Sequence, residues 1–135
     1  MLSKSGVHAV RALVVLAGLP EGEYRGASSI ADETGAPRNY LGKLLQLLSR
    51  RGLVESQKGL GGGFRLSRSP GNISLFDVID AIEDTSRWTE CILGNPSCSD
   101  GSPCSVHDKW GPVRDSYLGL LKQTYITELT PANHI

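Results

Sequence analysis

All three cysteines of the chain fall within one short stretch, from Cys91 to His107, and this stretch constrains the fold more than any other. Six residues separate Cys91 from Cys98, five separate Cys98 from Cys104, and His107 follows one helical turn after the last cysteine. The residues between them are rich in Gly, Pro, Ser, Asn and Asp, which form turns and bury little. A loop of this composition needs something besides a hydrophobic core to hold it.

Metal ligation is the interpretation that uses all four of these side chains. A disulfide would leave one thiol over, whereas thiolates and imidazoles are ligands of zinc and of iron–sulfur clusters. Cys104 and His107 are three residues apart and would share one face of a helix. Structural zinc sites favour closely spaced cysteines, so the wider spacing favours an iron–sulfur cluster, with zinc as the alternative.

Two other interpretations of the cysteines remain. Free cysteines often behave as small buried hydrophobic residues, although the polar neighbours Ser97, Ser99 and Asp100 argue against burial here. In the second, one cysteine is a nucleophile activated by His107, but a catalytic thiol does not need two further cysteines nearby.

Composition and charge indicate one compact domain with two electrostatically different halves. The chain has 135 residues and a net charge of zero, yet residues 1–68 carry ten Lys/Arg against five Asp/Glu, and the remainder carries four against nine. A basic N-terminal half is typical of a protein that meets a polyanion. No apolar run approaches the ~20 residues of a membrane span, and no targeting segment is recognisable, so we expect a cytoplasmic protein with reduced thiols.

Apolar periodicity predicts three helices in the basic half. The first runs from Ser3 or Ser5 to Ala17, the second begins at a Ser28 or Ser29 N-cap and ends at Gly35, and the third covers residues 38–51. The third helix carries leucines on one side and polar or basic residues on the other. Two helices joined by a short turn, the second amphipathic and basic, are typical of a helix-turn-helix.

A glycine-rich hairpin is expected directly after these helices. Residues 53–57 and 64–68 have strand patterns, and residues 58–63 contain the glycines that permit a tight turn. This combination is typical of the wing in a winged helix. A phosphate-binding loop of a nucleotide-binding protein is the alternative, but such a loop should lead from a strand into a helix.

The second half is expected to contain two more helices around the cysteine loop. Ser74 would cap a fourth helix, and residues 105–129 carry a long apolar stripe that suits packing against a second copy. The expected fold is mainly α with a small β-hairpin. Residues 1–73 would form the winged helix-turn-helix and 74–135 the cysteine loop (about 87–105) and dimerisation helix, within one compact unit.

No convincing catalytic constellation is present, so an enzyme is not expected. Four carboxylates lie along the fourth helix and are expected to form its solvated face: Asp77, Asp80, Glu83 and Asp84.

Taken together, these motifs resemble the Rrf2 family of bacterial winged-helix transcription regulators, and in particular its iron–sulfur cluster branch. The matching residues are Ala27–Ala31, Tyr40-Leu41, Leu44-Leu45, Gly52–Val54, Gly61–Leu66, the three cysteines, and His107–Trp110.

The resemblance implies a homodimer that crosses its long helices, binds a palindromic operator in double-stranded DNA, and holds a cluster with Cys91, Cys98 and Cys104. In one branch of the family, a histidine placed like His107 is the fourth ligand of a 2Fe-2S cluster, which we favour. In another branch, a 4Fe-4S cluster takes a ligand from the first helix of the partner, where this chain has His8. The residues expected to contact DNA are Ser28, Arg38, Asn39, Tyr40, Lys43, Lys58, Gly61, Gly62 and Arg65.

Overall fold

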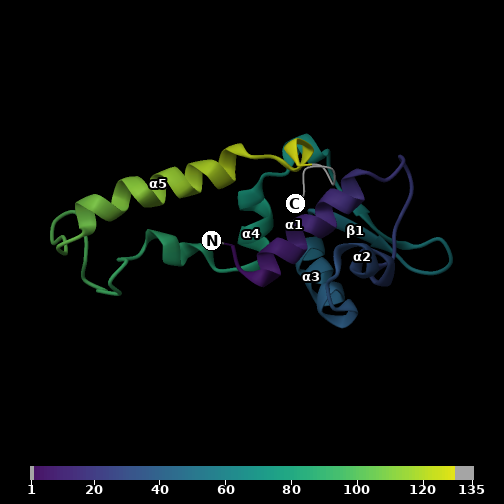
Figure 1. Cartoon of the computed structure of the whole chain (residues 1–135), viewed down its shortest axis with the longest axis horizontal. Coiled ribbons are helices and arrows are strands. Elements are labelled where there is room, and N and C mark those ends of the chain that lie inside the picture. Colours follow the sequence, from purple (N-terminus) through teal and green to yellow (C-terminus); the bar gives the residue numbers. More distant parts are fainter. Residues whose placement is uncertain (1, 130–135) are drawn as a thin grey trace.

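The computed structural model describes residues 2–129 (Figure 1). Its helices are α1 (Lys4–Ala17), α2 (Ala27–Thr34), α3 (Arg38–Arg50), α4 (Leu75–Ile82) and α5 (His107–Gln123). The strands are β1 (Val54–Gln57) and β2 (Gly63–Leu66), and short 3-10 helices are η1 (Pro70–Asn72), η2 (Thr85–Thr89) and η3 (Ile126–Glu128). The expected fold class, mainly α with one small hairpin, is confirmed.

Helix α1 is the central element of the packed part of the molecule, the body, and contacts α2, α3, α4, β2 and η3. Gly6 permits close packing against α4, because a Cβ at this position would lie 2.7 Å from Cδ1 of Ile79. The apolar side of α3 faces this core, as its periodicity predicts. Its buried residues are Leu41, Leu44, Leu45 and Leu48.

The hairpin is anchored to the segment that leads into α2. Strands β1 and β2 pair antiparallel from Val54–Leu66 to Gln57–Gly63. Arg25 and Phe64 exchange two backbone hydrogen bonds of 2.9 and 2.8 Å. Gly63 is required at this junction, because its φ is +131° and a Cβ would lie 2.4 Å from the Arg25 carbonyl. The wing therefore has a fixed position relative to the helix-turn-helix.

Two expected helix ends are wrong. Helix α2 begins two or three residues earlier than expected, with Gly26 rather than Ser28 or Ser29 as its N-cap, so both serines lie within its first turn. The last helix ends at Gln123 rather than near residue 129, because the chain becomes extended and pairs with residues 73–75. Ile126 donates a 2.9 Å backbone hydrogen bond to Ile73 and is fully buried, so core packing overrides the helical pattern there.

The four carboxylates on α4 and directly after it do not form the one solvated face that was expected. Asp77 caps its own helix, Asp80 accepts hydrogen bonds from Arg51 and Thr85, and Glu83 is bonded to Ser3 and Arg87. Asp84 is exposed and holds the first turn of η2. The hydrogen bonds from Thr85 and Arg51 lower the pKa of Asp80.

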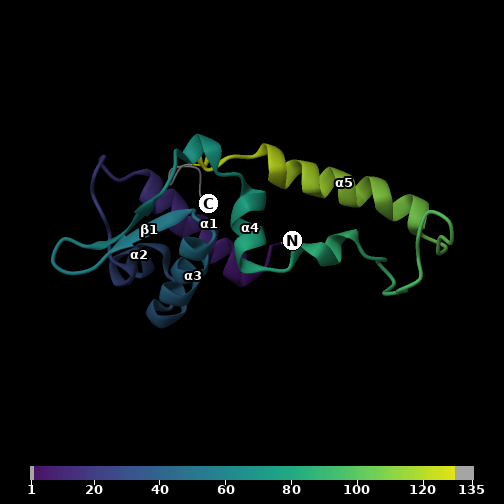
Figure 2. The ribbon, with the colours of Figure 1, turned by 180° about the vertical axis from the view of Figure 1, so that it is seen from behind.

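A long arm projects from the body. The chain leaves α4 through η2, reaches the cysteine loop at the tip, and returns along α5 (Figure 1). The wing lies at the opposite end of the molecule, and the view from behind shows the same separation (Figure 2). No helix within residues 2–129 is long and apolar enough to cross a membrane.

Replacement of Ser74 by alanine is expected to destabilise the fold by about 1 kcal/mol. Ser74 Oγ accepts a 3.0 Å hydrogen bond from the Asp77 amide, and the Asp77 carboxylate accepts a 3.0 Å hydrogen bond from the Ser74 amide. The variant loses both the cap and the reciprocal arrangement. Urea unfolding at fixed protein concentration measures the change, with the exposed Ser105→Ala as control. Equal stability of the two variants would contradict the prediction.

Candidate metal centre and nucleic-acid interface

The cysteine loop is built from turns and is attached at both ends to helices. Cys91 follows η2 directly after Glu90, and Cys104 lies just before α5. The indole Nε1 of Trp110 donates a 3.2 Å hydrogen bond to the Glu90 carbonyl, which ties the two sides of the arm together. This contact places the first and last cysteine next to each other.

The three cysteine sulfurs form one compact group. All three Sγ atoms lie within 4.8 Å of one another, and the thiols are free and half-buried. The Sγ atoms of Cys91 and Cys104 are 3.6 Å apart, and Cys98 Sγ accepts a 3.4 Å hydrogen bond from the Cys104 amide. The spacing in the sequence therefore brings all the thiols of the chain to one point.

His107 lies beside this group, at the first residue of α5. Its Nδ1 is 3.3 Å from Cys98 Sγ, whereas its Nε2 is 2.9 Å from Oδ1 of Asp100. His107 is not part of the group whose ligand atoms are all within 4.8 Å of each other. The structure thus brings the predicted fourth ligand next to one of the three sulfurs.

The contact between Asp100 and His107 was not predicted from the sequence. The sequence indicates Asp100 only as a polar neighbour of the cysteines. The Asp100-Gly101 pair between two serines is a tight-turn signal that would have indicated a fixed carboxylate.

The backbone makes the three thiols chemically unequal. Amides of Asn95 and Leu93 donate to Cys91 and lower the pKa of its thiol to about 7. The Cys104 amide acts in the same direction on Cys98, but burial and the neighbouring thiols outweigh it, so the pKa of Cys98 is raised. Cys91 is therefore the thiol that ionises most readily of these two, and thiolates are the ligating form.

Two hollows lie next to the sulfurs. The smaller, about 30 Å³, is lined by all three cysteines, His107, Trp110 and Arg114 among others. The larger, about 450 Å³, opens beside Cys91 and Cys98, and its lining also includes Thr89, Glu90, Gly94, Asn95 and Pro96. The first has the size of one ion or water, whereas the second has room for a larger inorganic group on the open side of the loop.

His8 lies in α1, in a different part of the molecule from the cysteine loop (Figure 1). Its ring packs edge-on against Tyr40, with the ring centroids 6.0 Å apart. Within residues 2–129, its buried Nδ1 has no hydrogen-bond partner. His8 would reach a metal centre only if a second copy brought its cysteine loop to α1.

Most of the residues expected to contact DNA are exposed on α2, α3 and the wing. Asn39 and Lys43 lie on the solvent side of α3, and Lys58 lies at the start of the wing turn. Ser28 and Gly61 are also exposed. Arg38 is exposed but engaged, since its guanidinium binds both carboxylate oxygens of Asp32 at 2.9 and 3.0 Å.

Three other candidates are engaged in contacts within the protein. The Tyr40 hydroxyl is hydrogen-bonded to Ser5, and its ring packs against the core, so the side chain faces α1 rather than a groove. Arg65 is paired with Glu55 and lies 4.5 Å above the ring of Tyr24. A Cβ at Gly62 would lie 2.2 Å from the Gln57 carbonyl, so this glycine closes the hairpin itself.

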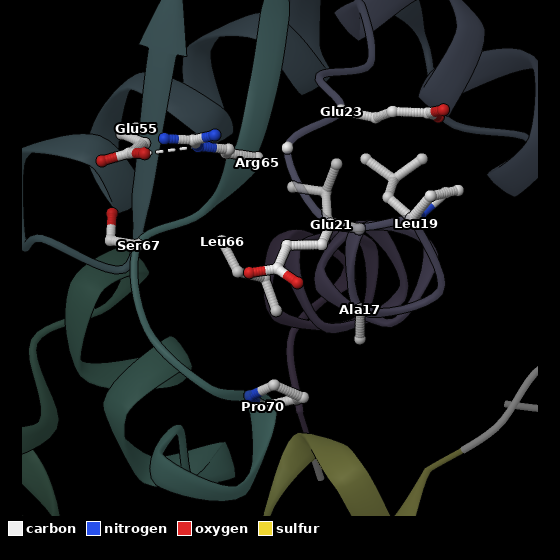
Figure 3. A pocket seen from close by; sticks show the side chains of 12 residues that line it. Ala17, Leu19, Glu21, Glu23, Glu55, Arg65, Leu66, Ser67 and Pro70 are labelled. Atoms are coloured by element: carbon white, nitrogen blue, oxygen red, sulfur yellow. Dashed lines mark hydrogen bonds and ion pairs between the residues drawn. The ribbon is translucent and has the colours of Figure 1, made fainter.

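An acidic cavity of about 370 Å³ lies at the base of the wing, between the end of α1 and β2 (Figure 3). Its lining includes the carboxylates of Glu21, Glu23 and Glu55, with Arg65 bound to Glu55. Figure 3 shows Glu21 turned toward Leu66. Carboxylates repel phosphates, so this side of the wing is unsuited to the DNA backbone.

Comparison with known proteins agrees with this architecture. A model of the Rrf2 family, described as iron-dependent transcriptional regulators, matches residues 2–132. The chain is 31% identical over 128 residues to the HTH-type transcriptional regulator IscR of Citrobacter koseri, covering 95% of this chain and 78% of that protein. It is 37% identical over 95 residues to a protein of Aquifex aeolicus named as an HTH-type transcriptional regulator, covering 69% of this chain and 66% of that protein, slightly less than two thirds of its length.

Solved structures show the same fold. IscR of T. potens has a TM-score of 0.75 and 26% identity, with 94% of this chain and 83% of that chain covered. CymR, the global cysteine regulator of B. subtilis, has a TM-score of 0.77 and 23% identity, with 94% and 93% covered. An oxidised form of Staphylococcus aureus CymR has a TM-score of 0.73 and 25% identity, with 93% and 92% covered.

Proposed function

Because the chain belongs to the Rrf2 family of transcription regulators, we propose that it is a DNA-binding homodimer that senses iron–sulfur, redox or nitric oxide status through a metal centre in the cysteine loop. The observation that carries this proposal is the meeting of Cys91, Cys98 and Cys104 within 4.8 Å, with His107 alongside. A protein with only a DNA-binding role would have no need for this group. The cytoplasm supplies both DNA and the reducing conditions that keep thiols free.

An iron–sulfur cluster is the proposed group, with the 2Fe-2S form favoured. Cys91, Cys98, Cys104 and His107 would hold it, because three thiolates and an imidazole match the ligand chemistry of such clusters. The hollow that all four residues line is about 30 Å³, and the larger hollow of about 450 Å³ beside Cys91 and Cys98 offers adjoining space on the open side of the loop. When bound, the cluster supplies a centre that accepts an electron and reacts with oxidants. His8 of a second copy is the alternative fourth ligand.

DNA binding is assigned to the end of the molecule opposite the cysteine loop. Asn39 and Lys43 on α3 would face the major groove, and Lys58 on the wing would reach phosphate. The excess of basic residues in the first 68 positions supports this assignment. The metal centre and the DNA-contacting surface are far apart within one chain. A change at the centre would therefore affect DNA binding by altering how the two copies are placed relative to each other.

Helix α5 is the proposed dimer contact. Val113 and Leu120 are each 59% exposed, and their separation of seven residues places both on one side of the helix. Exposed apolar side chains aligned in this way suit a second copy of the same helix, as in a two-fold symmetric dimer. Such a dimer would present two winged helices to a palindromic operator.

A second candidate is a sensor without a cluster, either zinc-stabilised or based on thiol oxidation. A single tetrahedral zinc ion holds its sulfurs about 3.8 Å apart, close to the 3.6 Å between Cys91 and Cys104. The same proximity would permit a disulfide: hydrogen peroxide would take two electrons and two protons from the thiols and leave two waters.

Anaerobic purification followed by visible spectroscopy and iron, sulfide and zinc analysis tests these proposals. We expect a coloured protein with iron and sulfide in equal amounts, because a 2Fe-2S cluster contains two of each. A colourless protein with one zinc per chain would overturn the cluster and support the zinc alternative. Protein without metal, in which peroxide removes two free thiols, would support the thiol sensor.

A further inference from the structure

The two nitrogens of the His107 imidazole face different partners. Nδ1 lies 3.3 Å from Cys98 Sγ, on the side of the sulfur group, and Nε2 lies 2.9 Å from the Asp100 carboxylate. A neutral imidazole carries one N–H, and a carboxylate accepts hydrogen bonds but does not donate them. The proton therefore belongs on Nε2, and the lone pair of Nδ1 faces the sulfurs.

Asp100 is held in place by a tight turn, although its side chain is exposed. Ser99 and Ser102 exchange two backbone hydrogen bonds of 3.2 and 3.1 Å, and Asp100-Gly101 forms the two-residue turn between them. Ser99 Oγ accepts a further 3.1 Å bond from the Ser102 amide. Asp-Gly is a favoured pair for such turns. The local sequence thus directs the carboxylate toward His107.

We propose that Asp100 is a positioning residue that fixes the tautomer of His107 and so makes Nδ1 the ligating atom of the metal centre. This inference rests on the proposed function, because it requires a metal at the three cysteines. Metal-bound histidines commonly donate their other N–H to a carboxylate, which fixes the ring and increases its basicity. Metal binding at Nδ1 would strengthen the bond from Nε2, since it withdraws electrons from the ring.

Cobalt(II) binding to the reduced, metal-free protein under argon tests this role. Asp100→Asn keeps the size of the side chain but removes its charge, and is expected to weaken cobalt(II) binding by about 10- to 100-fold. Asp108→Asn is the matched control, because Asp108 is exposed in the first turn of α5 and changes the net charge equally. It should alter the affinity by no more than about twofold.

A double substitution separates positioning of His107 from a general effect on the loop. His107→Ala combined with Asp100→Asn should bind cobalt(II) no more weakly than His107→Ala alone, because Asp100 acts through the imidazole. Additive losses would overturn the proposal. In protein loaded with cadmium(II), NMR of isotope-labelled histidine should show the metal coupled to Nδ1, and coupling to Nε2 would also overturn it.

Failure of this inference is distinguishable from failure of the proposed metal centre. If the wild-type protein binds cobalt(II) and Asp100→Asn binds it equally well, the positioning role is wrong and the centre stands. If the wild-type protein binds neither cobalt(II) nor iron and sulfide on anaerobic reconstitution, both are wrong.

Discussion

Protein carrying Cys98→Ala is expected to retain less than about a tenth of the wild-type iron and sulfide after anaerobic reconstitution, because each missing thiolate ligand opens the cluster to solvent. Cys98 is central to the site, since its Sγ is next to His107 and accepts a bond from the Cys104 amide. Cys91→Ala and Cys104→Ala should behave in the same way. Iron and sulfide analysis with visible spectroscopy measures the loss.

The same variants should remain folded, because the cysteine loop lies at the tip of the arm, away from the core of α1, α3 and α4 (Figure 1). Without metal, their unfolding free energy should stay within about 0.5 kcal/mol of metal-free wild type. Ser97→Ala is the control, as an exposed neighbour of Cys98 that should retain full iron. Full occupancy in Cys98→Ala would show that the ligand assignment is wrong.

The parts of the fold that were predicted correctly depend on local chemistry. The leucine spacing of α3 identified its buried side, and Ser74 with Asp77 identified the start of α4. Glycines in the sequence identified the end of α2 and the wing turn, and several of them have the positive φ that these turns require. Each of these signals is complete within a few residues, so it is visible in the sequence.

The errors arose where distant segments decide the structure. The chain after Gln123 leaves the helix because Tyr125 forms an isolated β-bridge with Ser74, and no local pattern marks this pairing. The Tyr40 hydroxyl is bound by Ser5 of α1, a contact between distant residues that the sequence does not indicate, and the DNA-binding role of Tyr40 stays a prediction. The contact between Asp100 and His107 depends on how the loop folds, because seven positions separate the two residues in the sequence. The roles of the site residues and the boundary between 1–73 and 74–135 remain predictions.

Removal of Lys58 should weaken binding to every DNA sequence. It should also make the slope of log affinity against log salt concentration less steep by about one unit. Its exposed ammonium at the start of the wing turn is positioned to neutralise one phosphate. Affinities of Lys58→Ala at several salt concentrations, on a selected operator and on scrambled duplex, measure both effects. Lys109→Ala is the control, because Lys109 is exposed on α5 near the opposite end of the molecule.

Asn39→Ala should show the other pattern, a loss of about 1 to 3 kcal/mol on the operator and little change on scrambled DNA. Asn39 is exposed in the first turn of α3, where a helix-turn-helix reads base edges, and its amide can donate to and accept from one base. Asn72→Ala in η1 provides an exposed asparagine away from this surface. If Lys58→Ala and Asn39→Ala both leave operator affinity unchanged, α3 and the wing do not form the reading surface, and DNA recognition must lie elsewhere on the molecule.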